Sequence, residues 1–156
     1  MVKNVFKKLG KKQKNNKGFS LVELIVVIAI MAVLVGVLAP QLIKYVEKSR
    51  EATDIQTCDN IATALKTYYA DEEVSASATT ATTVTVTLTT TELGTGADTA
   101  VKDAGLTKAK IKGTKWTSDK ITIVYDKKDG TIEYTGDSPY YHSDKDQFKK
   151  GPKSGK

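Results

Sequence analysis

The sequence predicts an α+β fold, in which one long N-terminal helix, half transmembrane and half amphipathic, packs on a small antiparallel β-sheet. Three observations lead to this prediction. Residues 24–43 form an uncharged run of 20 residues. Apolar side chains then recur at helical spacing from Ile55 to Tyr68, and short segments with alternating apolar residues follow. In a chain of 156 residues, this leaves one small soluble domain after the apolar run.

The uncharged run is long enough to cross a bilayer. As a helix that rises about 1.5 Å per residue, 20 residues span about 30 Å, the thickness of the hydrocarbon layer. Seven lysines and no acids lie in residues 1–18, so the N-terminus is expected to stay in the cytoplasm and the remaining chain to lie outside. Without those lysines, 17 basic side chains face 18 acidic ones. The net charge of +6 therefore gives little support to nucleic-acid binding.

The helix is expected to continue beyond the apolar run, to about Glu72, with an apolar stripe that packs on a sheet. The stripe comprises Ile55, Cys58, Ile61, Leu65 and Tyr68. Cys58 is the only cysteine, so no intrachain disulfide can form and the thiol is expected to be a small buried apolar group. The charged side chains are expected on the opposite, solvated face: Lys44, Glu47, Lys48, Arg50, Glu51, Asp54 and Asp59.

The outer domain is expected to contain a loop rich in serine and threonine, a sheet and a polar tail. The loop covers Ser75–Thr91 and contains an alternating segment, Val84–Leu88. Asp126–Gly130 predicts a hairpin turn, because glycine readily adopts positive φ. Trp116 is expected in the core. The other predicted elements are a short helix or loop at 98–106, strands at 110–117, 120–125 and 131–135, and a solvated, partly disordered tail at 136–156.

Composition argues against an enzyme. His142 is the only histidine, which leaves little for acid–base chemistry near neutral pH and excludes a site with several histidine ligands. The sequence offers no nucleophile–base pair, no paired catalytic carboxylates and no phosphate-binding loop. Asp137, Asp144 and Asp146 match no recognisable calcium loop. We therefore expect neither a cofactor nor a metal.

The start of the helix resembles the processing motif of type IV prepilins, which is a class III signal peptide shared by pilins and pseudopilins. The resemblance rests on the segment KGFSLVE at 17–23, followed by the apolar segment LIVVIAI. It implies that a prepilin peptidase cuts between Gly18 and Phe19 and then N-methylates Phe19. A glycine before the cut is physically reasonable, because the absence of a side chain lets the backbone approach the peptidase closely.

Glu23 and Pro40 are the remaining candidate assembly residues, together with Phe19. A carboxylate in an apolar helix is costly and usually has a partner. The resemblance implies that Glu23 pairs with the N-terminal amine of a neighbouring subunit; the alternative is a glutamate that reaches headgroup water. Pro40 removes a helical hydrogen bond to Gly36. The resemblance implies that residues 33–40 can extend on assembly, as in some filaments of the family; the alternative is a static kink that marks the membrane exit.

The resemblance thus predicts a structural subunit that polymerises through its N-terminal helix into a surface filament for adhesion, motility or DNA uptake. The expected parts are a cleaved leader at 1–18, a transmembrane and assembly helix at 19–39, an extracytoplasmic head at 40–135 and a tail at 136–156. Expected partners are further copies of the chain, the prepilin peptidase and N-methyltransferase, an inner-membrane platform and an assembly ATPase. Before assembly, the subunit would be a single-pass protein of the cytoplasmic membrane. Two alternatives are a pseudopilin of type II secretion or competence and a membrane-anchored binding module that never polymerises.

Overall fold

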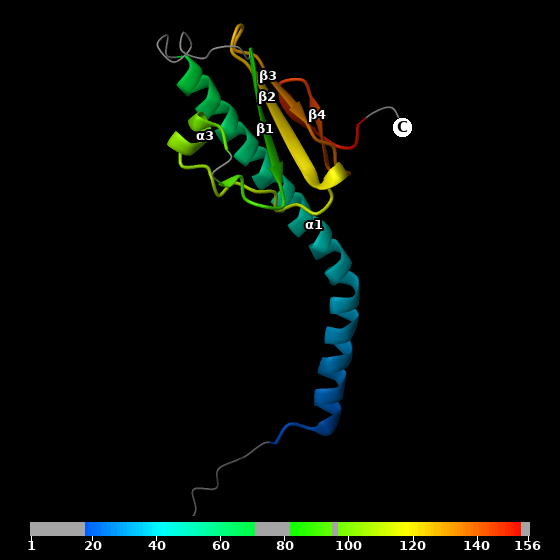
Figure 1. Ribbon diagram of the computed structural model, residues 1–156. Coiled ribbons are helices and arrows are strands. Elements are labelled where there is room, and N and C mark those ends of the chain that lie inside the picture. The colour runs from blue at the N-terminus through cyan, green and yellow to red at the C-terminus, as the bar shows by residue number, and fades with distance from the viewer. Residues whose placement is uncertain (1–17, 71–81, 95–96, 154–156) are drawn as a thin grey trace, which may run out of the picture. The chain divides into compact units, whose positions relative to one another are not determined.

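The computed structural model describes residues 18–70, 82–94 and 97–153, and these divide into two units, residues 1–40 and 41–156 (Figure 1). Each unit is described by itself below. The predicted leader, apart from Gly18, lies outside the described residues, as do the first part of the threonine-rich loop and the last three residues of the predicted tail. One helix, α1 (Leu21–Tyr69), contributes to both units.

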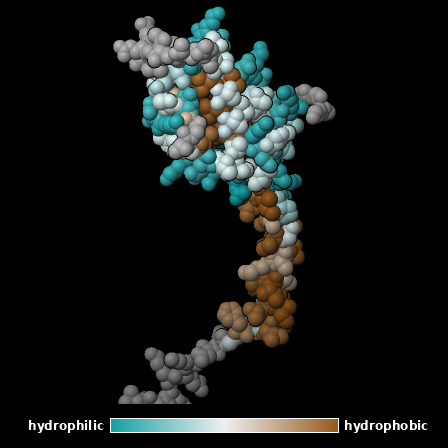
Figure 2. Space-filling model, viewed as in Figure 1, coloured by the Kyte–Doolittle hydropathy of each residue, from teal (hydrophilic) through white to brown (hydrophobic). Residues whose placement is uncertain are grey.

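The first unit contains the apolar part of α1. Its mean hydropathy reaches 3.1 over an 18-residue window, and none of that window is buried. The helix therefore meets the length and composition of a bilayer-spanning segment. Pro40 lies inside α1, and the helix continues through it. Figure 2 shows this segment as an almost continuous hydrophobic surface.

The second unit, called the head from here on, combines the rest of α1 with two small antiparallel sheets. The larger sheet has the order β1-β2-β3, and β4 pairs with β5 in a separate hairpin. A short helix, α3, follows β1, and a 3-10 turn, η3, precedes β2 (Figure 1). Their bounds are β1 (Thr83–Thr89), α3 (Thr99–Asp103), η3 (Thr117–Asp119), β2 (Lys120–Asp126), β3 (Ile132–Thr135), β4 (Tyr141–Asp144) and β5 (Gln147–Lys150).

The core of the second unit forms where the apolar stripe of α1 meets one face of the larger sheet. Alternate residues of each strand point to opposite faces of a sheet, and the buried positions of the first three strands carry large apolar side chains. On the helix, Cys58, Ile61 and Leu65 are fully buried. The core also includes Val84, Val86, Leu88, Ile121, Ile123, Tyr125, Ile132 and Tyr134. The predicted α+β fold is confirmed.

The β2–β3 hairpin closes at the predicted turn. Gly130 has a φ of 70°, in the left-handed region that favours glycine. The side chain of Asp126 accepts a hydrogen bond from Lys128 N at 2.8 Å, and that of Asp129 accepts one from Thr131 N at 3.1 Å. These contacts hold the turn with local side chains, as is usual for aspartates in turns.

Two sequence-based expectations about the secondary structure of the second unit are wrong. Residues 110–117 form no strand, because the backbone N–H groups of Lys112, Gly113 and Thr114 bond to side chains of α1 instead of to a neighbouring strand. Helix α1 ends at Tyr69, and the end predicted near Glu72 lies outside the described residues. The polar segment after Gly136 is not a solvated tail as far as residue 150: β4 and β5 pair there, and Ser138, Tyr141 and Ser143 are buried.

Candidate functional site: the N-terminal segment and the buried carboxylates of α1

The N-terminal segment begins with a reciprocal helix cap formed by two of its residues. Ser20 N donates to Glu23 Oε2 at 2.9 Å, while Val22 N donates to Ser20 Oγ at 3.3 Å. A serine followed three residues later by glutamate is a capping box, which satisfies backbone N–H groups that the first helical turn leaves free. Phe19, next to this cap, is 91% exposed. The structure therefore holds the Glu23 carboxylate at the backbone of the residue that follows Phe19.

The helix beyond this cap presents an apolar surface that nothing in the chain covers among the described residues. Every large apolar side chain from Leu21 to Val46 is at least 43% exposed. Burial of apolar surface yields about 25 cal/mol per Å², so such a helix is strongly driven towards lipid or towards other apolar helices. The roles predicted for Gly18, Phe19, Glu23 and Pro40 in processing and assembly remain predictions, because each role involves a second molecule, either a peptidase or another copy of the chain.

Three carboxylates beyond the apolar surface form a second feature, and the solvated position expected for them is wrong. Glu47, Glu51 and Asp54 were expected on the solvated face of the helix, but their exposed fractions are 7%, 0% and 1%. They are called the buried carboxylate cluster below. The other charged residues expected on that face are exposed, as predicted: Lys44, Lys48, Arg50 and Asp59.

Asp54 is the most fully bonded member of the buried carboxylate cluster. Its Oδ1 accepts a hydrogen bond from Lys112 N at 2.8 Å, and its Oδ2 accepts one from Gly113 N at 2.7 Å. The indole Nε1 of Trp116 donates to the same Oδ2 at 2.9 Å. Glu47 adds a bond from Thr114 N. Together these carboxylates hold the irregular segment 112–116 on α1, because bonds from neutral donors to a charged acceptor are stronger than neutral pairs.

Close approach of this segment to the helix requires glycine at 113. A Cβ there would lie 2.7 Å from Glu51 Cγ and 2.9 Å from Trp116 Nε1. Both distances are shorter than van der Waals contact, so a larger residue would push the segment away from α1. Gly113 thus lets the backbone N–H groups reach Asp54.

Glu51, between the other two carboxylates, connects α1 to the start of β4. Its Oε2 accepts a hydrogen bond from Ser138 Oγ, whereas its Oε1 is buried and has no partner among the described residues. The pKa of Glu51 is raised, chiefly because burial penalises the charged form and also because Glu47 and Asp54 carry like charges; the Ser138 hydroxyl opposes the shift.

Two hydrogen bonds between a tyrosine hydroxyl and an aspartate carboxylate also connect α1 to the rest of the second unit. Tyr134 OH donates to Asp59 Oδ1 at 3.0 Å, and Tyr69 OH donates to Asp98 Oδ2 at 3.1 Å. Burial, followed by the charge of Asp98, raises the pKa of Tyr69 to about 12. The side chain of Asp98 also accepts a bond from Ala100 N at 2.9 Å, which caps α3. These contacts fix the C-terminal end of α1 to the segment that leads into α3.

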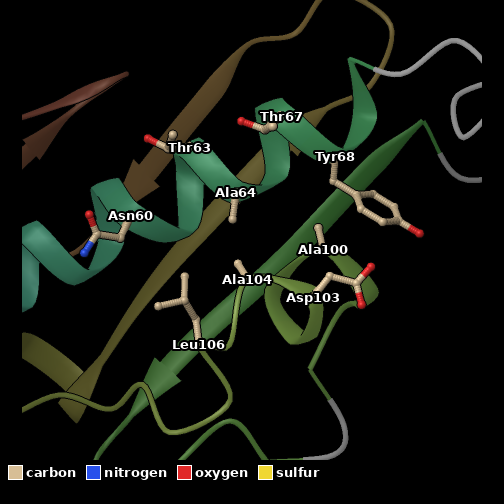
Figure 3. A pocket seen from close by; sticks show the side chains of 9 residues that line it. All are labelled: Asn60, Thr63, Ala64, Thr67, Tyr68, Ala100, Asp103, Ala104 and Leu106. Atoms are coloured by element: carbon tan, nitrogen blue, oxygen red, sulfur yellow. The ribbon is translucent and has the colours of Figure 1, made fainter.

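A groove of about 520 Å³ lies between the C-terminal part of α1 and α3 (Figure 3). Figure 3 shows small apolar side chains, Ala64, Ala100 and Ala104, together with Thr63 and Asp103. This lining holds no nucleophile beside a base. Within residues 18–70, 82–94 and 97–153, no group of three or more histidine, cysteine or acidic side chains could hold a metal ion.

Comparison with known proteins finds a family match for the N-terminal segment. Residues 13–39 match the family described as the prokaryotic N-terminal methylation motif. The chain is also similar to "Prepilin peptidase-dependent protein A" of Clostridium perfringens (strain 13 / Type A), with 41% identity over 71 residues. That alignment covers 44% of this chain and 50% of the relative, so the chain spans about half of the relative's length. No solved structure matches the chain.

One N-terminal segment contains the helix cap of Ser20 and Glu23, the start of the exposed apolar helix and the family match. The resemblance to prepilins is confirmed for the motif at residues 13–39. This chain carries the N-terminal methylation motif of prepilins, the segment that type IV pilins and pseudopilins share.

Proposed function

We propose that this chain is the structural subunit of a type IV pilus, cleaved after Gly18, N-methylated on Phe19 and polymerised through its N-terminal helix into a surface filament. The observation that carries the proposal is the exposed apolar surface of α1, most of which lies within the methylation motif at residues 13–39. A helix of this kind needs an apolar environment before and after it leaves the membrane. Packing against identical helices of other copies provides one, and the head remains in water.

Glu23 would set the register of this packing. In a single chain, its carboxylate uses Oε2 to accept the Ser20 N–H. A carboxylate has about four acceptor sites, so the same side chain has capacity left for the N-terminal amine of another copy. Once helices pack around the pair, both charges lose water, and their mutual attraction grows as the local dielectric constant falls. A copy without its partner charge would then bury an unpaired charge.

The test replaces Glu23 in the native cell and measures leader cleavage and sheared surface filaments together. Glu23→Ala removes both the cap and the charge, whereas Glu23→Gln keeps an amide oxygen that can accept the Ser20 N–H. We expect cleaved subunits without filaments for both variants. The matched control is Glu133→Ala, at an exposed position of β3, which should form filaments at the wild-type level.

Other outcomes would point elsewhere. Normal filaments with Glu23→Gln and none with Glu23→Ala would assign Glu23 to the helix cap and remove it from subunit pairing. A wild-type chain that is cleaved but never appears in sheared filaments would favour a pseudopilin, which assembles into a short structure within a secretion or competence system. A wild-type chain that is neither cleaved nor assembled would contradict the proposal and favour a plain membrane anchor.

A further inference from the structure

The buried carboxylate cluster is unevenly supplied with hydrogen-bond donors. Asp54 accepts from three described donors, and Glu47 accepts from Thr114 N and lies 3.7 Å from Arg50 Nη1. Glu51 has the Ser138 hydroxyl alone, although its exposed fraction is 0%. Its second oxygen, Oε1, has no partner among the described residues. The middle carboxylate of the cluster is therefore the least supported.

The surroundings of Glu51 are also poor in positive charge. Glu47 and Asp54 lie one turn before and one turn after it on α1. The segment 112–116 offers its backbone N–H groups and the Trp116 indole to those two neighbours, not to Glu51. From the β3–β4 connection come the Ser138 hydroxyl and, next to it in sequence, Asp137, another carboxylate with an unpartnered buried oxygen. In the described parts of the chain, no lysine, arginine or histidine nitrogen lies within 4.0 Å of a Glu51 oxygen.

A third negative charge at this position would be costly. Buried carboxylates normally avoid ionisation unless a cation or several donors compensate for the lost water. Two like charges one helical turn away add to the cost. The tight contact of Gly113 with Glu51 Cγ, where a Cβ would come to 2.7 Å, leaves little space on that side for a compensating ion.

We propose that Glu51 is a proton-binding site of the head, neutral while α1 is packed in the second unit, and that its ionisation favours opening of the contacts that bury it, because an ionised Glu51 regains water only when these segments separate from α1. The segment of Ser138 is one of them, and Ser138 Oγ also accepts hydrogen bonds from Tyr140 N at 3.1 Å and Tyr141 N at 3.0 Å, at the start of β4. Opening there would therefore reach the edge of the β4–β5 hairpin, although the single bond from the Ser138 hydroxyl by itself favours the charged form of Glu51.

The sign of the pH effect follows from the direction of the shift. Burial raises the pKa of Glu51 above its ordinary value, so the folded head binds a proton that the unfolded chain has already lost. The contribution of Glu51 to stability is fully present below the unfolded pKa, about 4.3, and is lost as the pH rises through the raised folded pKa. The contribution of Glu51 should thus make the head more stable at mildly acidic pH, where Glu51 is protonated, than at higher pH, where it is ionised.

The experiment uses the full chain in detergent micelles and follows two quantities. Carbon-13 NMR of labelled glutamate side chains gives the titration of Glu51, whose carboxyl signal is assigned in the wild-type chain by correlation through its side-chain carbons to its backbone amide, and is checked by its absence in Glu51→Gln. We expect a midpoint above the ordinary glutamate value of about 4.3. A midpoint at or below 4.3 would overturn the proposal. This measurement on the wild-type chain decides the question even if Glu51→Gln fails to fold.

The second quantity is the thermal midpoint of the head, followed by the fluorescence of Trp116, the only tryptophan. The wild-type midpoint should decrease with rising pH through the Glu51 titration, and Glu51→Gln should lose that part of the decrease. The matched control Glu133→Gln, at an exposed position, should retain it. A Glu51→Gln variant that keeps the full wild-type pH dependence would also overturn the proposal. Neither measurement depends on filament formation. The proposed function can therefore fail while this inference holds, and this inference can fail while the proposed function holds.

Discussion

The indole N–H of Trp116 donates to Asp54 Oδ2 at 2.9 Å, although the two residues are 62 positions apart in the sequence. Both side chains are almost completely buried. The bond joins α1 to the segment before β2 and uses the one polar atom of a side chain that otherwise packs in the core. A buried tryptophan usually finds such a partner. In this head, the partner is a charge on the helix.

The first prediction concerns that charge. In Asp54→Asn, an NH₂ group would face at least one of the three donors that now bond to the carboxylate. We expect the free energy of unfolding of the head to fall by about 3 kcal/mol, the upper range for hydrogen bonds to a charged group. Denaturant unfolding followed by Trp116 fluorescence checks this. Asp103→Asn, at an exposed position, should change it by less than about 0.5 kcal/mol; equal effects of the two substitutions would contradict the assignment.

The second prediction concerns Gly113. In Gly113→Ala, the new methyl group would overlap Glu51 Cγ and Trp116 Nε1. We expect a loss of about 1–3 kcal/mol in the free energy of unfolding, which is typical of overpacking. The same denaturation experiment measures it. Gly36→Ala is the control, because a Cβ at that helical position meets no atom within 4 Å. An unchanged unfolding midpoint for Gly113→Ala would show that segment 112–116 approaches α1 less closely than described.

The third prediction concerns alkaline pH. The pKa of Tyr69 is raised to about 12, from an ordinary value of about 10. The contribution of its protonated hydroxyl is therefore fully present below pH 10 and is lost as the pH rises through about 12. In Tyr69→Phe, the thermal midpoint of the head should fall less between pH 9 and pH 12 than in the wild type. Tyr45→Phe, at an exposed site, should behave like the wild type. An identical alkaline decrease in Tyr69→Phe would exclude Tyr69 as a contributor.

The fourth prediction concerns Pro40. Pro40→Ala restores a backbone N–H that can bond to Gly36 O, so α1 should gain about 3 kcal/mol of local helix stability. Amide hydrogen exchange in micelles should become slower for residues 36–40. If assembly requires residues 33–40 to extend, the same variant should also yield fewer surface filaments from normally cleaved subunits. Slower exchange with a normal number of filaments would favour a static kink in this region.

The sequence predicts the elements that depend on local pattern. The apolar run, the stripe from Ile55 to Tyr68 and the strands around Val86 and Ile123 all follow from periodicity, and the Asp126–Gly130 turn follows from its residue types. These features are largely independent of the rest of the chain, because alternation and helical spacing already determine which face is apolar.

The buried carboxylate cluster was missed because its burial depends on segments far away in sequence. A signal for it nevertheless exists. Glu47, Glu51 and Asp54 continue the spacing of Cys58, Ile61 and Leu65 towards the N-terminus, at steps of three and four residues. They therefore lie on the face that packs on the sheet. Charge alone predicted that these side chains are exposed to solvent. Their position on the stripe instead indicates burial, with hydrogen-bond donors supplied by another segment.

The errors at residues 110–117 and after Gly136 have the same origin. Ile111 and Trp116 suggested a strand, but three backbone N–H groups between them, at residues 112–114, bond to carboxylates of α1. The polar segment after Gly136 folds because Ser138 contacts Glu51 and because Phe148 packs near Trp116, with ring centroids 5.7 Å apart. Composition cannot reveal either contact, since each joins residues that are far apart in the chain.

Cys58 has a practical consequence for experiments on this protein. It is the only thiol, its exposed fraction is 0%, and burial raises its pKa, so little of the reactive thiolate is present in the folded head. A cysteine introduced at an exposed site such as Thr135 would then be the only position that accepts a fluorophore or a spin label. The wild-type chain thus serves as its own labelling background, and later reaction of Cys58 would report the opening of the core.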